Sequence, residues 1–240
     1  MDSITARLVA RANSYPGITA GIARLEDVLD APSYHAVPEG AFASSVSDET
    51  AAVEWPPEAR SVLVLALHHP EEEPSLDWWH AGVSPGHRRL ADIGASLRPW
   101  LESELGMEAF PLPYSAERGG VFLKDAAALA GLGIIGRSNL LVSPQWGPRI
   151  RFRALLIEGD LTPTGPLLDF APCESCSELC HLACPRDAFV TGAYHRPTCI
   201  ERINRDVAHK VPERLAGDGA GPRLVVKYCR ACELACPVGH

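Results

Sequence analysis

All eight cysteines of this 240-residue chain lie in its last third, between positions 173 and 236. They form two runs, each with a CxxC unit and a closing Cys-Pro, and the first run has a further cysteine between these two parts. The first run is Cys173-x2-Cys176-x3-Cys180-x3-Cys184-Pro185, and the second, after a lone Cys199, is Cys229-x2-Cys232-x3-Cys236-Pro237. Eight thiolates are the number that two [4Fe–4S] clusters need, four each. The spacing therefore predicts two cubane clusters and a protein that transfers single electrons.

Two other interpretations of the cysteines remain open at this point. CxxC pairs also bind zinc tetrahedrally, although zinc ribbons need neither a third cysteine one turn later nor a following Cys-Pro. A disulfide framework suits short secreted chains, and the N-terminal segment MDSITARLVARANSYPG has no apolar signal-peptide core. The cluster interpretation is favoured because it accounts for the third cysteine and the closing Cys-Pro, and because no export signal supports disulfides.

The ligand sets follow from the way in which paired clusters are built. In two-cluster ferredoxins the last cysteine of each run binds the other cluster. Cluster one would then take Cys173, Cys176, Cys180 and Cys236. Cluster two would take Cys184, Cys199, Cys229 and Cys232. The first run has three residues between its second and third cysteines where the bacterial pattern has two, so we expect a bulged loop with an unchanged ligand count.

Composition restricts the remaining possibilities. Hydrophobic residues make up 46% of the chain and charged residues 22%, as in globular proteins. The formal net charge of −8 disfavours a protein whose main task is to bind nucleic-acid phosphates. No apolar run reaches the roughly 18 residues of a membrane span. With reduced cysteines and no export signal, these features predict a cytoplasmic protein without a membrane partner.

Periodicity predicts a mixed α/β organisation. Helices are expected over 2–14, 87–105 and 120–130, and strands over 18–25, 61–67 and 150–160. MEAFPLPY, after the second of these helices, predicts a further short strand. Residues 31–59 are rich in Pro, Ser and Ala and predict a long loop.

A glycine-rich segment follows the third predicted helix. GLGIIG at 131–136 fits the dinucleotide pattern G-x-G-x-x-G only superficially, because that motif must lie between a strand and a helix. Here a helix comes first and a strand follows. The glycines instead indicate a backbone that something flat can approach closely. Beyond them Arg149, Arg151 and Arg153 alternate with apolar residues, which predicts a strand whose basic face lies in solvent or faces an anion.

Aromatic and histidine side chains give weaker signals. His68 and His69 directly follow a buried strand, so they are either site residues or loop residues with local hydrogen bonds. Trp78 and Trp79 lie in an expected polar loop. They either line a cavity for a flat ligand or a partner interface, or they pack the loop against the domain. His181 lies inside the first cysteine run and is expected to tune a cluster by hydrogen bonding.

One long segment carries a resemblance to a known family. AGLGIIGRSNLLVSPQWGPRIRF (130–152), followed by the double-cluster cysteine pattern, resembles the epoxyqueuosine reductases and their relatives, which include the reductive dehalogenases. The resemblance implies an α+β protein, with a nitroreductase-like α/β domain over 1–165 and a ferredoxin-like domain with two [4Fe–4S] clusters over 166–240. It also implies a cobalamin along the glycine segment. The residues expected to bind this cofactor are Gly131, Gly133, Gly136, Arg137, Ser138, Asn139, Arg149 and Arg151.

The segment before the glycines departs from the family pattern. Epoxyqueuosine reductases carry Asp-Ser-Ala there, and the Asp is their proposed proton donor. This chain has Tyr114-Ser115-Ala116-Glu117, so Tyr114 is the expected donor and Glu117 the second candidate. Tyrosine, with an unperturbed pKa of about 10, stays protonated at neutral pH. The changes make tRNA a possible substrate but not a favoured one.

Three functions agree with these observations. The first is an oxidoreductase that passes electrons through two clusters to a corrinoid and then to a small molecule or modified nucleoside, with reduced ferredoxin or flavodoxin as donor. The second is an electron-transfer or activating protein that reduces a partner's corrinoid, and it predicts an exposed apolar surface beside cluster one. The third is a cobalamin-handling reductase. The first is favoured on resemblance.

Overall fold

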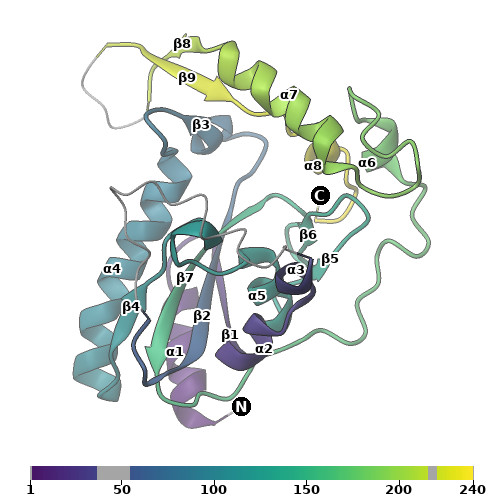
Figure 1. The fold of residues 1–240 in the computed structure, drawn as a ribbon. Coiled ribbons are helices and arrows are strands. Elements are labelled where there is room, and N and C mark those ends of the chain that lie inside the picture. Colours follow the sequence, from purple (N-terminus) through teal and green to yellow (C-terminus); the bar gives the residue numbers. More distant parts are fainter. Residues whose placement is uncertain (1, 37–54, 216–220, 240) are drawn as a thin grey trace. The chain divides into compact units, whose positions relative to one another are not determined.

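The computed structural model describes residues 2–36, 55–215 and 221–239 and separates into two compact units (Figure 1). Each unit draws on separate parts of the chain. Unit 1 comprises 1–67, 90–133 and 152–169, and unit 2 comprises 68–89, 134–151 and 170–240. All eight cysteines belong to unit 2. The expected division into a domain of residues 1–165 and one of 166–240 stays a prediction.

Unit 1 is built around a four-stranded sheet. Its order is β1 (Ile18–Arg24), β2 (Ala59–His68), β7 (Ile150–Glu158) and β4 (Ala109–Pro111). β1 pairs antiparallel with β2, from Ile18 opposite Leu67 to Arg24 opposite Ser61. β4 pairs antiparallel with the far end of β7. The continuous apolar run of β2 fits a central strand that is covered on both faces.

Two helices cover one face of this sheet. α1 (Ser3–Asn13) begins where the Asp2 carboxylate accepts hydrogen bonds from the amides of Ile4 and Thr5, both at 2.8 Å. α4 (Pro85–Leu105) shows the three- and four-residue apolar spacing of an amphipathic helix. Together with alternate residues of the strands, these helices form the core; its helical members are Leu8, Ala12, Leu90, Ile93, Leu97 and Leu101.

The opposite face of β1 receives a second helical layer. Ala20 and Ile22 belong to the core with α1, so Gly21 between them faces the other way. A Cβ at Gly21 would lie 2.3 Å from the carbonyl oxygen of Ala130, the residue that ends α5 (Leu123–Leu129). α2 (Leu25–Leu29) contacts both β1 and α5. Two short segments complete unit 1, α3 (Pro32–His35) and the single-turn η2 (Ala116–Arg118).

Unit 2 contains small sheets and short helices. Its three-stranded sheet has the order β3 (Trp78–Trp79), β9 (Arg223–Lys227) and β8 (Val211–Glu213), and η1 (Pro74–Asp77) precedes β3. β5 (Ile134–Ile135) and β6 (Leu141–Val142) form a hairpin. Three helices accompany the cysteines: α6 (Leu179–Leu182), α7 (Arg196–Ala208) and α8 (Ala231–Leu234). Helices α6 and α8, which carry Cys180 and Cys232, contact one another.

Most predicted elements of unit 1 are confirmed to within three residues at each end, and the mixed α/β class is confirmed. Two predictions are wrong. Trp78 and Trp79 form strand β3 rather than a polar loop, since both pair with β9. Pro32–His35, at the start of the predicted loop, is helical, and residues 37–54 of that loop lie outside the described residues.

Within the described ranges, no helix combines the length and apolar character needed to cross a membrane. The cytoplasmic location stays a prediction.

Candidate functional site

The structure brings thiols from the two cysteine runs together. Burial, followed by the negative charge of Cys236, raises the pKa of Cys180, and Cys176 and Cys173 add to this rise. Cys236 in turn is affected by Cys173 and Cys176. These four cysteines, called group one below, therefore lie close together although Cys236 is far from the others in sequence. The same four cysteines are the ligands expected for cluster one, and this ligand set stays a prediction.

A second set of thiols gathers beside helix α8. Burial raises the pKa of Cys232 to about 12, and the charges of Cys229 and Cys199 contribute next. A smaller effect of Cys180 on the same thiol indicates that the two sets are neighbours. Cys229, Cys232 and Cys199, together with Cys184 as the fourth expected ligand, are called group two below. The sulfur of Cys184 lies 3.4 Å from the amide of Ala188.

The donor set fits iron–sulfur chemistry. All eight cysteines are free thiols of intermediate burial. Because neighbouring thiolates repel each other, bound cations would be needed to keep them ionised together. Among the residues that the structure describes, no three His, Cys, Asp or Glu side chains converge on a site for one metal ion. A cubane does not need this convergence, because each of its four irons binds a different thiolate. That these thiolates bind clusters stays a prediction.

The extra residue of the first run is accommodated by a left-handed backbone. Glu178, between Cys176 and Cys180, has a φ of 58° and directly precedes helix α6. Its carboxylate lies 3.1 Å from Nδ1 of His181 and forms an ion pair with Arg137. The turn at Glu178 is the bulge that the spacing predicted.

The end of the glycine-rich segment and the residues after it lie against group one. A Cβ at Gly136 would lie 3.2 Å from the sulfur of Cys173. The buried Arg149 donates hydrogen bonds to the carbonyl oxygens of Cys236 at 3.2 Å and of Val238 at 2.6 Å. This part of the predicted cofactor-binding segment therefore surrounds cysteine ligands and holds the C-terminal loop.

The other two arginines predicted to bind a cofactor also contact protein groups. Arg151 forms a two-pronged ion pair with Asp77, at 2.9 and 3.1 Å, and a third contact with Glu233 at 2.8 Å. Arg137 pairs with Glu178, as described above. Both arginines therefore form ion pairs within unit 2. Binding of an anionic cofactor by either arginine stays a prediction.

Local packing accounts for the shape of the glycine segment. Gly131 has a φ of 73°, and a Cβ there would lie 2.9 Å from the carbonyl oxygen of Thr164. In the part of the segment that belongs to unit 2, Asn139 has a φ of 57° and donates its amide to the Gly136 carbonyl at 2.9 Å. Ser138 is buried, as is Gly133 in unit 1. The predicted cofactor-binding residues Gly131 and Gly133 thus lie in unit 1, and the others lie in unit 2.

The two predicted proton donors lie in unit 1. Tyr114 is 47% exposed, and the guanidinium of Arg153 lies 5.6 Å from the centre of its ring. Burial lowers the pKa of Arg153, and the nearby Tyr114 opposes this shift. Glu117 is exposed in the single turn η2. Their catalytic role stays a prediction.

Several residues around the cysteines were not found from the sequence. Tyr194 has a raised pKa because of burial and then because its hydroxyl is hydrogen-bonded to the Cys199 thiol. Asp206 accepts a hydrogen bond from the amide of Cys229 at 2.8 Å. Neither residue stands in a recognisable motif. Asp206 could have been suspected only from its place on an amphipathic helix that precedes the second run.

Two of the three histidines singled out in the sequence stack on aromatic rings. His68 is stacked on Trp146, with ring centres 5.0 Å apart, and His181 is stacked on Phe189 at 4.3 Å. His69 is fully buried, and its Nδ1 lies 3.0 Å from the Asp77 carboxylate. His68 ends strand β2 and stacks on a residue distant in sequence, so it is not a loop residue with local hydrogen bonds. A site role for His68 or His69 stays a prediction.

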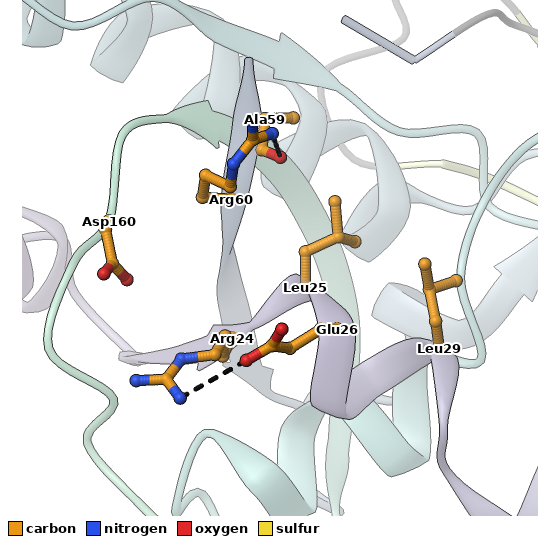
Figure 2. Close-up of a pocket in the computed structure, with 7 residues that line it drawn as sticks. All are labelled: Arg24, Leu25, Glu26, Leu29, Ala59, Arg60 and Asp160. Carbon is orange, nitrogen blue, oxygen red and sulfur yellow. Dashed lines mark hydrogen bonds and ion pairs between the residues drawn. The ribbon is translucent and has the colours of Figure 1, made fainter. Parts of the chain in front are cut away.

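Unit 1 also contains an open pocket of about 540 Å³ (Figure 2). Figure 2 shows charged side chains on one side of this pocket and two leucines on the other. Its lining residues are Arg24, Leu25, Glu26, Leu29, Ala59, Arg60 and Asp160. No residue predicted for the site lines it. Arg24 pairs with Glu26 at 3.4 Å, and Arg60 donates to backbone carbonyls, so both cations have protein partners.

Sequence comparison finds curated relatives with one shared name. The chain is 23% identical over 227 residues to the epoxyqueuosine reductase of Staphylococcus aureus, covering 85% of this chain and 55% of that protein. It is 25% identical over 193 residues to the epoxyqueuosine reductase of Leadbetterella byssophila, covering 75% of this chain and 58% of that protein. The chain thus spans little more than half the length of these relatives. No protein-family model matches it.

Structure comparison finds the same fold. An epoxyqueuosine reductase from Streptococcus thermophilus matches with a TM-score of 0.65 and 18% identity, over 99% of this chain and 66% of that chain. A reductive dehalogenase, whose structure is described as suggesting a mechanism for B12-dependent dehalogenation, matches with a TM-score of 0.52 and 22% identity over 75% of this chain and 25% of that chain. These comparisons confirm the predicted resemblance, at low identity, to the superfamily that contains the epoxyqueuosine reductases and the reductive dehalogenases.

Proposed function

We propose that this protein is an iron–sulfur oxidoreductase that carries electrons through two [4Fe–4S] clusters. The observation that carries the proposal is the contact between helix α6, which carries Cys180, and helix α8, which carries Cys232, because it joins the two cysteine runs. The effect of Cys236 on the pKa of Cys180 agrees with this crossing. This crossing is the ligand pattern of two-cluster ferredoxins. The names of the curated relatives support the oxidoreductase class. We assign the ferredoxin-like domain to the cysteine-bearing region within 166–240, and the nitroreductase-like domain to 1–165.

The chain's own residues prepare the cluster sites. The clusters, when bound, would supply one-electron carriers. The amides of His181 and Val238 are hydrogen-bonded to the thiols of Cys180 and Cys236, which lowers the pKa of each thiol against the effect of burial. Such bonds favour the thiolate and tune the potential of a cluster. Arg149 fixes the loop that carries Cys236.

The first experiment measures iron and sulfide in protein purified without oxygen. We expect about eight irons and eight sulfides per chain. Cys236→Ser and Cys180→Ser should remove the same electron paramagnetic resonance signal, and Cys232→Ser should remove a different one. Ser175→Ala, an exposed change inside the first run, is the matched control. Different signals lost by Cys180→Ser and Cys236→Ser would contradict the crossed ligand set.

We further propose that a cobalamin accepts the electrons. Support comes from the B12-dependent dehalogenation in the description of the dehalogenase neighbour. The glycines themselves add no support. A Cβ added at Gly131 or Gly136 would meet protein atoms, so packing within the protein already accounts for these glycines. Anaerobic titration with cobalamin tests the proposal, and an unchanged corrinoid spectrum at stoichiometric cobalamin would refute it.

The proposed substrate is a small molecule or a modified nucleoside. An epoxyqueuosine reductase has been solved with a modified tRNA stem loop, which supports the nucleoside class. Tyr114 is the proposed proton donor, with Glu117 as the alternative. In the active protein Tyr114→Phe should lower turnover strongly, whereas Tyr15→Phe serves as a tyrosine control in the N-terminal segment. Unchanged turnover of Tyr114→Phe would remove this residue from the mechanism.

One observation agrees with a second function, that of an electron-transfer or activating protein. Leu179 and Leu182, on either side of Cys180 in the sequence, are 40% and 80% exposed. An apolar surface beside group one is what the activating role predicted, and it equally suits docking of a reduced ferredoxin or flavodoxin. Leu182→Glu should slow electron exchange with such a protein without lowering the iron content. The cobalamin-handling role stays a third prediction.

A further inference from the structure

Four charged side chains form a closed ring of ion pairs in unit 2. Asp77 and Glu233 supply the carboxylates, and Arg151 and Arg230 supply the guanidinium groups. Arg151 contacts Asp77 at 2.9 and 3.1 Å and Glu233 at 2.8 Å. Arg230 contacts Asp77 at 3.1 Å and Glu233 at 2.5 Å. We call this set the charge ring.

The charge ring is well shielded from solvent. The side chains of Asp77, Arg230 and Glu233 are 10%, 12% and 6% exposed, and that of Arg151 is 21% exposed. Charges removed from water are costly unless each is paired with good geometry. Here every carboxylate contacts both guanidinium groups. The ring is therefore electrically balanced, with two positive and two negative charges.

A buried histidine completes the surroundings of Asp77. Nδ1 of His69 lies 3.0 Å from Asp77, and the carbonyl of His69 accepts a hydrogen bond from Arg230 at 2.7 Å. Gly86 leaves room for this imidazole, since a Cβ there would lie 2.2 Å from Nε2 of His69. Burial lowers the pKa of His69, and the hydrogen bond and charge of Asp77 oppose this shift. The charge balance given above counts the two carboxylates and the two guanidinium groups.

The position of the ring in the sequence connects it to group two. Arg230 directly follows Cys229, and Glu233 directly follows Cys232. Asp77 and Arg151 come from distant segments, and neither lies near a cysteine in sequence. The ring thus joins the second CxxC loop to η1 and to the start of β7. A purely mechanical connection does not need charges, because apolar residues of similar volume often stabilise a buried contact as well or better.

We propose that Asp77 is a positioning residue that sets the reduction potential of the cluster held by group two. It does so by balancing two guanidinium groups that would otherwise stabilise the reduced, more negative cluster. This inference rests on the proposed function, since it needs a cluster on group two. Charge near a cluster is one of the features by which a protein sets its potential.

A set of four charge variants tests the inference by redox titration of both clusters. Asp77→Asn removes a negative charge and should raise the potential of one cluster, by about a tenfold change in its reduced-to-oxidised ratio, or about 59 mV for one electron. Arg151→Gln should lower the same potential. The double variant restores the balance and should return the potential close to that of the wild type. Glu104→Gln, an exposed carboxylate in unit 1, is the matched control and should shift neither potential.

The outcomes separate this inference from the proposed function. The shifted signal should be the one that Cys232→Ser removes, with the iron content unchanged. Equal or same-direction shifts in the two single variants, with both clusters present, would overturn the role of Asp77 and leave the proposed function standing. If Asp77→Asn loses its cluster, Arg151→Gln and the double variant decide the question. A wild-type protein without clusters would overturn both proposals.

Discussion

Arg149 offers a direct test of how the C-terminal loop is held. It is only 3% exposed and donates one hydrogen bond to the Cys236 carbonyl and one to the Val238 carbonyl, at 3.2 and 2.6 Å. Hydrogen bonds to a charged group contribute about 1.5–3 kcal/mol each. Because the longer bond falls at the weak end, the two together stabilise the loop by about 3 kcal/mol or more. Arg149→Met keeps most of the side-chain volume and removes both bonds.

The expected consequence is faster loss of the cluster on group one. If opening of the Cys236 loop limits this loss, about 3 kcal/mol corresponds to a rate increase of roughly a hundredfold at 25 °C. The assay follows iron release to a ferrous chelator under nitrogen, by absorbance. Arg149→Lys keeps the charge without the two-pronged donor and should fall between Met and wild type.

Arg88→Met is the matched control for this test. Arg88 is exposed in α4, where such changes usually alter stability by less than about 0.5 kcal/mol. Iron release from Arg149→Met at the wild-type rate would refute the reasoning, because it would show that these hydrogen bonds do not hold the ligand loop. Equal acceleration by Arg88→Met would show that the effect is not specific to the loop.

Three other predictions concern single contacts. Gly136→Ala places a Cβ 3.2 Å from the Cys173 sulfur and should lower the iron content from about eight to about four per chain; full iron would contradict this. Tyr194→Phe removes the hydrogen bond to Cys199 and, because such bonds favour the reduced cluster, should lower its potential by about 40 mV in a redox titration, with the iron content unchanged. Thr164→Val removes the hydroxyl that accepts from a strand amide at 2.8 Å and should destabilise unit 1 by about 1–3 kcal/mol, measured as a lower Tm; an unchanged Tm would show that the bond adds nothing.

The regular elements of unit 1 follow closely from local sequence. The run SVLVLAL is apolar at every position except its serine, and a strand covered on both faces needs that character. Helix α4 repeats leucine and isoleucine at three- and four-residue intervals, which is the spacing of one buried face. Both signals are local, so a sequence pattern is enough to reveal them.

The small elements of unit 2 could not be predicted in this way. Strand β3 has two residues and exists because Trp78 and Trp79 pair with Lys227 and Val226. That pairing joins segments about 150 positions apart, and no local pattern announces it. The same reason hid the role of Asp77, whose four-residue 3-10 turn carries no motif.

The sequence by itself determined the number, type and spacing of the thiols, because a cluster needs four cysteines whose spacing is covalently fixed. It also predicted a bulged loop in the first run, because one extra residue must be accommodated somewhere between Cys176 and Cys180. The structure shows the left-handed residue Glu178 there. The tertiary structure decided what the arginines contact. From alternation alone Arg149 and Arg151 formed a basic face, whereas in the folded chain one binds the Cys236 loop and the other closes the charge ring. The partners of a charged side chain depend on segments that only folding brings together, and pairing matters most where burial makes an unpaired charge costly.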